Sequence, residues 1–332
     1  MPCIQNLLYG VWQRIIIPEG YTEMKIKKVM TSARRDTLAA YAFLAPVIIG
    51  FLWFILYPMV RTLYMSFTKW TIHGESTFVG LQNWTRMFTD DRIFGISVRV
   101  TLTFTLWAVL INLVIGFILA LLLNKPRKTV GLFRTIFYIP CMIAAGAPVM
   151  LVWLWIFDPD GMLNSILGTF GIQGMNWLLS QKTALGAIIA TSAWGVGTTM
   201  IIYISGLKAV PEEYYESAEI DGAGYFRKLF GITIPILTPV ILYNLIIGVI
   251  GAMQAFTQAY VLTRGGPRDS TKFFALNIYQ QAFTNMNFGY ASALAWLLFI
   301  AIMILTYVIF KTSARWVFYG DGMDTAPTKE KY

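Results

Sequence analysis

Six long apolar stretches dominate this sequence and restrict what it can fold into. They lie at Leu38–Leu63, Val100–Leu123, Thr135–Phe157, Ala184–Leu207, Ile236–Leu262 and Ala291–Phe310. Each has the length of roughly 17 to 25 residues that a helix needs to cross a bilayer. Because lipid cannot satisfy the hydrogen bonds of an open backbone, such segments cross it as helices. The sequence therefore predicts an all-α membrane protein with six transmembrane helices.

The composition supports this fold class. Charged residues make up 13% of the 332 residues, against roughly 25% in an average soluble domain. So few charges cannot cover a water-soluble protein of this size, and we expect a lipid bilayer around it. The net charge of +9 comes from basic residues dispersed between the apolar stretches, which fits membrane topology and not nucleic-acid binding.

Histidine and cysteine are scarce. His73 is the single histidine, and the two cysteines, Cys3 and Cys141, lie far apart. They leave no material for a His/Cys zinc site, an iron–sulfur cluster or a disulfide framework. We expect His73 to be a plain surface residue, and we expect no catalytic or metal-binding residue in the chain.

The distribution of basic residues predicts the orientation. Of the 26 lysine and arginine residues, 17 lie in the N-terminal tail, the 124–134 loop, the loop after the fourth stretch and the C-terminal tail. Since basic loops stay in the cytoplasm, both termini are expected there. The predicted parts are a cytoplasmic tail (1–37), a six-helix transmembrane domain (38–311) and a second cytoplasmic tail (312–332), with the loops 67–97, 158–183 and 263–289 facing outward.

The predicted spans hold almost no ionisable residue. Arg61 and Arg99 lie near span ends, where a long side chain reaches the polar interface. A proton- or sodium-driven carrier typically needs a carboxylate inside the membrane, and none lies at a span centre. The chain also lacks the G-x-x-x-x-G-K-[ST] phosphate loop. If the protein moves a solute uphill, the energy must therefore enter from another polypeptide.

The longest loop on the predicted cytoplasmic side, 208–235, has a pattern of its own. Pro211 suits a first helical turn, and the acidic residues Glu212 and Glu213 favour the positive end of the helix dipole. Gly222 and Gly224 break the helix, because glycine tolerates a positive φ. We predict two short helices joined at a glycine. From these features alone, a structured connection without a further role is the commoner alternative.

The spacing within this loop is more specific than its composition. The residues Glu216, Ala218, Gly222, Ile232 and Pro235 match the pattern E-A-A-x3-G-x9-I-x-L-P, with Ser217 in place of the first alanine and Ile234 in place of leucine. Both departures are conservative in size. The chain thereby resembles the permease subunits of binding-protein-dependent ABC importers.

Further segments resemble the carbohydrate-importer branch of that family, which includes the maltose and glycerol-phosphate permeases. They are LAP at Leu44–Pro46, YP at Tyr57–Pro58, SFT at Ser66–Thr68, FVGLQNW at Phe78–Trp84, GLFRT at Gly131–Thr135, RGGPRDST at Arg264–Thr271 and FGYASA at Phe288–Ala293. The resemblance implies the type I ABC importer permease fold and the cytoplasmic membrane of a bacterium or archaeon. It also implies a second homologous permease, two copies of an ABC ATPase and an external solute-binding protein as partners. The ATPase would use ATP and Mg, and this chain would bind no cofactor.

By this resemblance, the helix around Glu213–Ile220 docks in a cleft of the ATPase. Glu216 would pair with a basic residue there, and Gly222 would allow a sharp turn. The expected coupling residues are Glu213, Glu216, Ser217, Ala218, Asp221, Gly222 and Ala223.

A path for a sugar should be polar but uncharged, since amides, hydroxyls and aromatic faces bind sugars. The fourth and fifth spans supply Trp194, Thr198, Asn244, Gly248, Gln254, Gln258 and Tyr260. Close helix packing is the alternative for the small residues of the WGVGTTM segment. In the family, sometimes only one permease of the pair holds the solute, so the sister subunit is the other candidate.

The outer loops would meet the solute-binding protein. The candidate contacts are Trp70, Trp84, Trp177, Arg264 and Arg268. Anchoring at the membrane interface is the alternative for the tryptophans.

The expected function is that of a permease subunit in an ATP-driven importer for a carbohydrate, expected to be an oligosaccharide. One alternative is an importer permease for another polar solute, such as glycerol phosphate or an acidic oligosaccharide. An alternative from a different class is a stand-alone secondary carrier.

Overall fold

The computed structural model describes residues 19–70, 76–125, 129–143 and 146–318, with the helical backbone alone at 19–33 and 35. His73 and most of the predicted C-terminal tail lie outside these residues. The chain divides into two compact units, Met1–Thr62 and Leu63–Tyr332.

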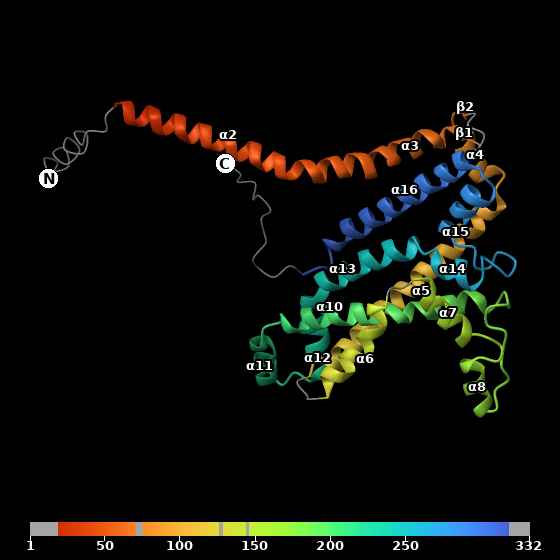
Figure 1. Cartoon of the computed structure of the whole chain (residues 1–332). Coiled ribbons are helices and arrows are strands. Elements are labelled where there is room, and N and C mark those ends of the chain that lie inside the picture. The colour runs from red at the N-terminus through yellow and green to blue at the C-terminus, as the bar shows by residue number, and fades with distance from the viewer. Residues whose placement is uncertain (1–18, 71–75, 126–128, 144–145, 319–332) are drawn as a thin grey trace, which may run out of the picture. The chain divides into compact units, whose positions relative to one another are not determined.

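The first unit is a long helical run (Figure 1). It consists of α2 (Glu19–Phe51), a π-helical turn at Leu52–Leu56 and the beginning of α3 (Tyr57–Ser66). The apolar part of the run is Asp36–Ser66, close to the first predicted span. The π turn precedes Pro58, which lacks an N–H and whose ring would clash with a carbonyl of the preceding turn. The helix begins inside the predicted N-terminal tail.

Further helices long and apolar enough to cross a membrane belong to the second unit. They are α5 (Arg92–Leu123), the run Ala184–Lys208, the run Tyr225–Met253 and α16 (Phe288–Ser313). The run at 184–208 contains α9 (Ala184–Thr191), a 3-10 turn (Ser192–Gly195) and α10 (Val196–Lys208). Over the described ranges, five continuous helices meet the criterion, and there are six if a bent pair is counted as one span.

The third predicted span, Thr135–Phe157, is not one helix, which corrects the prediction. The bent pair α6 (Val130–Met142) and α7 (Ala147–Ile156) takes its place, with an angle of 110° between the two helices. Pro140 lies in the last turn of α6, and Pro148 lies in the first turn of α7. Since proline removes a backbone donor and crowds the preceding turn, these positions favour a break.

The fifth predicted span, Ile236–Leu262, is also corrected. The helical run begins with α12 (Tyr225–Lys228), passes a π turn (Leu229–Thr233) just before Pro235 and continues as α13 (Ile234–Met253). The second short helix predicted in the 208–235 loop is therefore the beginning of this span. A break at 254–256 separates α13 from α14 (Thr257–Leu262).

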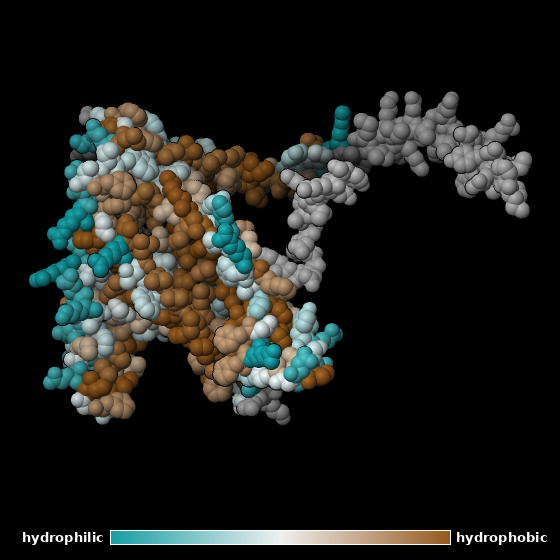
Figure 2. All heavy atoms as spheres, turned by 180° about the vertical axis from the view of Figure 1, so that it is seen from behind, coloured by the Kyte–Doolittle hydropathy of each residue, from teal (hydrophilic) through white to brown (hydrophobic). Residues whose placement is uncertain are grey.

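Short elements connect the spans at one end of the second unit. They are an antiparallel hairpin of β1 (Thr68–Trp70) and β2 (Ser76–Phe78), the helices α4 (Gln82–Thr89), α8 (Met162–Thr169) and α15 (Phe274–Tyr279), and a π turn at Gln280–Thr284. On the face shown in Figure 2, hydrophilic side chains gather along the left edge, and hydrophobic ones cover much of the helical body. This distribution suits a protein surrounded by lipid.

Helices α5, α10 and α13 pack closely through small residues. A Cβ on Gly116 of α5 would lie 2.8 Å from Thr199 of α10, and one on Gly206 of α10 would lie 2.6 Å from Leu237 of α13. Such close approach drives helix association in lipid, where burying apolar surface gives little gain. These three helices frame the site described next.

Candidate functional site

A cavity of about 370 Å³ opens among α5, the 192–195 turn, α10, α13 and α14. Its polar lining consists of Asn112, Thr191, Ser192, Thr198, Thr199, Tyr243, Asn244 and Gln258. None of the described residues that line it carries a charge at neutral pH. A solute in this cavity would therefore meet hydroxyl and amide groups and not ions.

Two amides of the wall are anchored through their nitrogen atoms. Asn112 donates from Nδ2 to the carbonyl oxygens of Ala108 and Ser192 at 2.9 and 3.2 Å. Asn244 donates from Nδ2 to the carbonyl oxygen of Val240 at 2.9 Å. No donor among the described residues bonds to either amide oxygen, so both oxygens can accept a hydrogen bond from a solute.

The structure brings five of the seven predicted path residues to this cavity. They are Trp194, Thr198, Asn244, Gly248 and Gln258. Gln254 lines a separate, largely apolar groove of about 740 Å³ against α15 and α16. The reason is local: α13 ends at Met253, so Gln254 does not continue the helical face that carries Asn244.

Asn112 is a cavity residue that the sequence pattern did not bring out. It lies inside α5 among mostly apolar residues. A lone amide within a span is costly in lipid unless it faces protein or a cavity. That signal would have found it.

Trp194 belongs to the frame of the cavity. Its indole Nε1 donates to the carbonyl oxygen of Pro140 at 2.8 Å, and its own carbonyl oxygen accepts from Cys141 Sγ at 3.2 Å. Its ring meets that of Trp153 edge-on at 6.1 Å. Because the indole N–H is already bonded, Trp194 offers the cavity its ring alone.

The WGVGTTM segment serves both packing and the cavity. A Cβ on Gly197 would lie 2.2 Å from the carbonyl oxygen of Phe137 in α6, so this position requires glycine for helix packing. Thr198, the next residue, is exposed and lines the cavity. The two interpretations of this segment therefore apply to neighbouring residues.

Tyr260 lies apart from the cavity lining, in a row of aromatic rings. Phe256 and Tyr260 stack with their centroids 5.1 Å apart, and Tyr279 of α15 lies 5.2 and 5.4 Å from them. Phe283 follows 5.1 Å from Tyr279, and Phe288 lies 6.2 Å from Phe283. These five residues are called the aromatic row below.

The end of α11 (Glu212–Ile220) shapes the loop between α10 and α12. Gly222 has φ +72°, its N–H donates to Glu219 at 3.0 Å, and the N–H of Ala223 donates to Ala218 at 2.8 Å. This pair of bonds is a Schellman cap, in which the residue after the helix is left-handed and favours glycine. The three-residue interval between Ala218 and Gly222 is the length that the cap requires.

Gly224 differs from Gly222. Its φ is −69°, and it begins α12 from an extended conformation. The prediction that both glycines adopt a positive φ is thus confirmed at Gly222 and wrong at Gly224. The loop needs one left-handed residue, because a single cap reverses the chain.

Side-chain contacts fix α11 to the helical run of α12 and α13. Tyr215 Oη and Thr233 Oγ1 lie 2.9 Å apart. Lys228 Nζ lies 2.5 Å from Glu219 Oε1, and this hydrogen bond and charge lower the pKa of the Glu219 carboxyl. A displacement of α11 can therefore be transmitted to α13.

The predicted coupling residues line the surface of this loop. Glu213, Glu216, Ser217, Asp221 and Gly222 are exposed residues, and Ala218 and Ala223 are half-buried. Ser217 Oγ donates to the carbonyl oxygen of Glu213 at 2.8 Å, which lets serine occupy the alanine position inside the helix. Ile220, which the sequence pattern did not bring out, is 87% exposed between these acidic residues.

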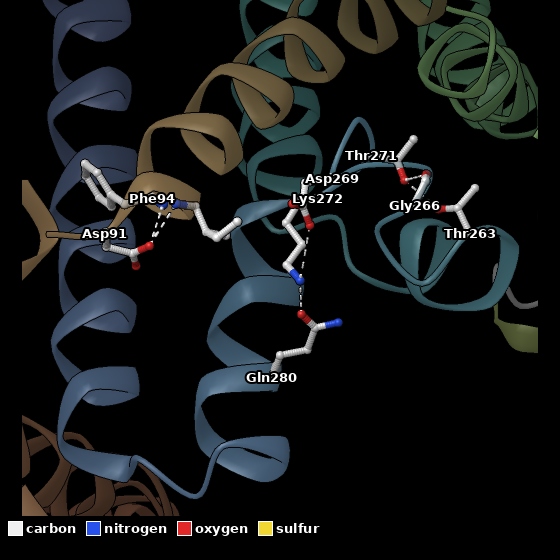
Figure 3. Close-up of polar contacts among 9 residues, drawn as sticks. Asp91, Phe94, Thr263, Gly266, Asp269, Thr271, Lys272 and Gln280 are labelled. Atoms are coloured by element: carbon white, nitrogen blue, oxygen red, sulfur yellow. Dashed lines mark hydrogen bonds and ion pairs between the residues drawn. The ribbon is translucent and has the colours of Figure 1, made fainter. Parts of the chain in front are cut away.

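Three of the family-like motifs meet in one packed corner. Asn83 Nδ2 donates to the carbonyl oxygen of Thr68 at 2.9 Å, and a Cβ on Gly289 would lie 2.0 Å from that same oxygen. Tyr290 Oη donates to Asp91 Oδ2 at 2.5 Å. Asp91 also accepts the first N–H groups of α5 (Figure 3). The segments SFT, FVGLQNW and FGYASA are thus joined by packing.

The tryptophans predicted for the outer loops are at least partly buried within the protein. Trp177 Nε1 donates to Asn164 Oδ1 at 2.8 Å, which makes it part of the frame of its loop. Trp70 and Trp84 are half-buried. The sequence could not show this because the partner Asn164 depends on the fold of the loop.

Arg264 and Arg268 are exposed in the loop between α14 and α15. Thr271 Oγ1 closes this loop by bonding to the carbonyl oxygen of Gly266 and to Thr263 Oγ1, both at 2.6 Å (Figure 3). Both arginines have positive φ, 53° and 48°. The loop therefore presents two cations on a well-bonded backbone.

Known proteins share this architecture. Residues 112–319 match the protein family described as binding-protein-dependent transport system inner membrane component. A probable ABC transporter permease protein of Bacillus subtilis, YesP, is 40% identical over 88% of this chain and 96% of its own length. The arabinooligosaccharides transport system permease protein AraP of the same species is 32% identical over 86% of this chain and 90% of its own length.

Solved structures confirm the expected fold. One chain in the crystal structure of a bacterial alginate ABC transporter, in complex with alginate pentasaccharide-bound periplasmic protein, superposes with a TM-score of 0.75. It is 22% identical, and the match covers 86% of this chain and 96% of the other. The fold is that of type I ABC importer permeases.

Proposed function

Because the chain belongs to the family of binding-protein-dependent transport system inner membrane components, we propose that it is the permease subunit of an ATP-driven carbohydrate importer. It lines the path of an oligosaccharide that an external solute-binding protein delivers. Its proposed partners are a second homologous permease and two copies of an ABC ATPase. ATP and Mg are used by the ATPase, and this chain binds no cofactor.

The uncharged polar cavity is the observation that carries the carbohydrate assignment. Asn112, Thr198, Asn244 and Gln258 supply donors and acceptors for sugar hydroxyls, and the ring of Trp194 supplies an apolar face. A phosphate or carboxylate solute would be better served by arginine or lysine. The lining therefore favours a neutral sugar over glycerol phosphate or an acidic oligosaccharide. The name of the relative AraP points the same way.

The helix α11 is the proposed docking element for the ATPase. Glu216 and Asp221 are exposed beside the apolar side chain of Ile220. The rings of Tyr225 and Phe226, which follow in the same loop, are exposed as well, and several exposed apolar side chains rimmed by polar residues are typical of a protein interface. Glu216 would pair with a basic residue of the ATPase, and closure of the two ATPases would move α13 through the contacts that fix α11 to it.

The proposed location is the cytoplasmic membrane of a bacterium or archaeon, with both termini in the cytoplasm. This orientation rests on the distribution of basic residues. It places α11 on the side of the ATPase. The hairpin, α4, α8 and the loop of Arg264 and Arg268 then face outward, where these two cations would contact the solute-binding protein.

Uptake by the reconstituted complex tests this function. The chain is purified with its native partners and placed in proteoliposomes that contain ATP, with the binding protein and radiolabelled arabino-, xylo- or gluco-oligosaccharides outside. We expect the sister permease and the ATPase to co-purify, and at least one series to accumulate with ATP and not with ADP. Accumulation by this chain alone without nucleotide would instead identify a secondary carrier. ATP-driven uptake of glycerol phosphate alone would overturn the sugar assignment.

A further inference from the structure

The aromatic row begins next to cavity-lining residues in the chain. Phe256, the first ring of the row, lies between Ala255 and Gln258 in the chain, and both of these residues line the cavity. The later rings belong to α15, the π turn after it and the first residue of α16. The row therefore connects the cavity with the short elements at the end of the second unit.

The rings of the row form an unbroken and accessible surface. Each ring has a neighbour in the row at a centroid distance of 5.1 to 6.2 Å. Tyr260 is 41% exposed and Phe283 is 59% exposed, and the other three rings are half-buried. Parts of several rings are thus accessible at once.

Neutral amide side chains lie next to the later rings of the row in the sequence, at Gln280, Gln281, Asn285 and Asn287. Gln281 Oε1 accepts from Asn285 Nδ2 at 3.1 Å, and no residue from 274 to 310 is charged. The cation Lys272 contacts Gln280 in this region, and it is held by Asp269 and Gln280 with its side chain 14% exposed (Figure 3). Aromatic faces framed by neutral amides suit the apolar face and the hydroxyl groups of a sugar.

Anchoring at the membrane interface is the other common role of exposed aromatic residues. An anchor needs an amphipathic ring at the headgroup level, and it does not need contact between rings or continuity with a cavity. Two of the rings, Tyr260 and Tyr279, do fit an anchor. The continuity from Phe256 to Phe288 favours a ligand that extends along the row.

We propose that the aromatic row is a second carbohydrate-binding strip, on which the outer units of a longer oligosaccharide stack while its leading units occupy the cavity. This inference rests on the proposed function as a carbohydrate permease. It predicts a dependence on chain length, because a pentasaccharide extends further from the cavity along the row than a disaccharide does.

The test compares two lengths of one oligosaccharide series in proteoliposomes of the full complex. The series is the one that the unchanged complex takes up among arabino-, xylo- and gluco-oligosaccharides. Phe283→Leu and Tyr279→Leu keep an apolar side chain and remove the aromatic face. We expect kcat/KM for the pentasaccharide to fall about two- to twelvefold, as for loss of one aromatic contact, with the value for the disaccharide unchanged.

Two variants separate stacking from other roles. Tyr279→Phe keeps the ring, so it should retain more of the pentasaccharide value than Tyr279→Leu does. Phe170→Leu removes a 77% exposed aromatic residue after α8, outside the row, and it should behave like the unchanged complex at both lengths. Phe283→Leu, at the more exposed site, carries the test if Tyr279→Leu does not assemble.

Equal losses for both lengths would overturn the inference in favour of packing or anchoring, and so would no loss at either length. If the unchanged complex takes up none of the oligosaccharides, the proposed function itself fails, and the strip fails with it. The two failures are therefore distinguishable.

Discussion

At the scale of single residues, the positive φ of Gly222 ends α11 and reverses the chain after it. No atom lies within 4 Å of a Cβ added at Gly222. A side chain therefore fits, and the cost is that of the left-handed backbone, about 1–2 kcal/mol. Gly222→Ala and Gly222→Trp share this cost, but only the second puts a large ring on the proposed docking surface.

We therefore expect both Gly222 variants in the membrane, with most transport kept by Gly222→Ala and none by Gly222→Trp. ATP-driven uptake in proteoliposomes measures transport, and stimulation of ATPase activity by the loaded binding protein measures coupling. Normal uptake by Gly222→Trp would refute the docking role of α11. Equal loss in both variants would assign the effect to backbone strain.

The hydroxyl of Thr198 gives a second prediction at this scale. Thr198 is exposed and lines the cavity, so Thr198→Val removes one hydrogen-bonding group at nearly constant volume. The loss of one neutral hydrogen bond is worth about 0.5–1.5 kcal/mol, and kcat/KM for the sugar should fall about two- to twelvefold. Thr306→Val, in the apolar groove of α16, is the matched control and should leave uptake unchanged. A result in which both variants transport normally would remove Thr198 from the path.

Local signals made some residues of the site predictable. The cap at Gly222 depends on a few neighbouring residues, so its spacing in the sequence is sufficient. Gln254 depends instead on where α13 ends, and the apolar pattern continues past that point. Asn112 could be marked as facing protein or a cavity, because it is a polar residue inside an apolar span, but the helices it faces depend on how α5 packs against α10 and α13.

At the scale of elements, the lengths of the spans follow from the bilayer, whereas their breaks follow from proline. Apolar length predicts α5 and α16 well, because their apolar stretches contain no strong breaker. Proline accompanies the break between α6 and α7 and the π turns before Pro58 and Pro235. Each proline leaves backbone groups without their usual helical hydrogen bonds, and local π geometry or neighbouring helices satisfy these groups instead. Such adjustments depend on the neighbouring helices, so hydropathy does not reveal them.

The contact of α10 with α6 gives a prediction at the scale of elements. A Cβ on Gly197 would meet the carbonyl oxygen of Phe137 at 2.2 Å, and a backbone atom cannot move aside as a flexible side chain can. Overpacking of this kind costs roughly 1–3 kcal/mol. We expect Gly197→Ala to lower the thermal midpoint of the purified complex.

Gly186→Ala is the matched control for Gly197→Ala. Gly186 lies in α9, in the same helical run, and nothing lies within 4 Å of its Cβ. Alanine there removes the poor helix propensity of glycine, by about 1 kcal/mol, so the midpoint should stay or rise. A Gly197→Ala midpoint equal to that of Gly186→Ala would show that α6 and α10 are not in close contact.

At the scale of the whole molecule, motifs that lie far apart in the sequence hold different helices together through packing contacts and hydrogen bonds. Gly289 has no Cβ and so leaves room for the carbonyl oxygen of Thr68. Tyr290 Oη donates to Asp91, the residue that caps α5. Arg134, in the GLFRT segment, donates from Nε and Nη2 to the carbonyl oxygen of Leu123 at the end of α5, at 3.0 and 2.6 Å. The resemblance to a family could locate these segments, but their shared physical role became visible only in the fold.

The orientation of the scaffold decides whether α11 can meet an ATPase, and cysteine labelling tests it. The native cysteines are first replaced by Cys3→Ser and Cys141→Ser. The second change keeps a donor for the carbonyl oxygen of Trp194, to which Cys141 Sγ donates. Two exposed positions then receive single cysteines, Thr169→Cys at the end of α8 and Glu212→Cys at the start of α11.

A maleimide that cannot cross the membrane should label the Thr169→Cys protein in intact cells, and it should label the Glu212→Cys protein only after the membrane is opened. We expect this pattern because lysine and arginine are in excess in the segments predicted to lie on the side of α11, and basic loops stay preferentially in the cytoplasm. Labelling of both variants in opened membranes controls for reactivity, because it shows that each thiol is accessible to the reagent. The reverse pattern in intact cells would place α11 outside, where no cytoplasmic ATP could drive it, and the proposed coupling through this helix would then be untenable.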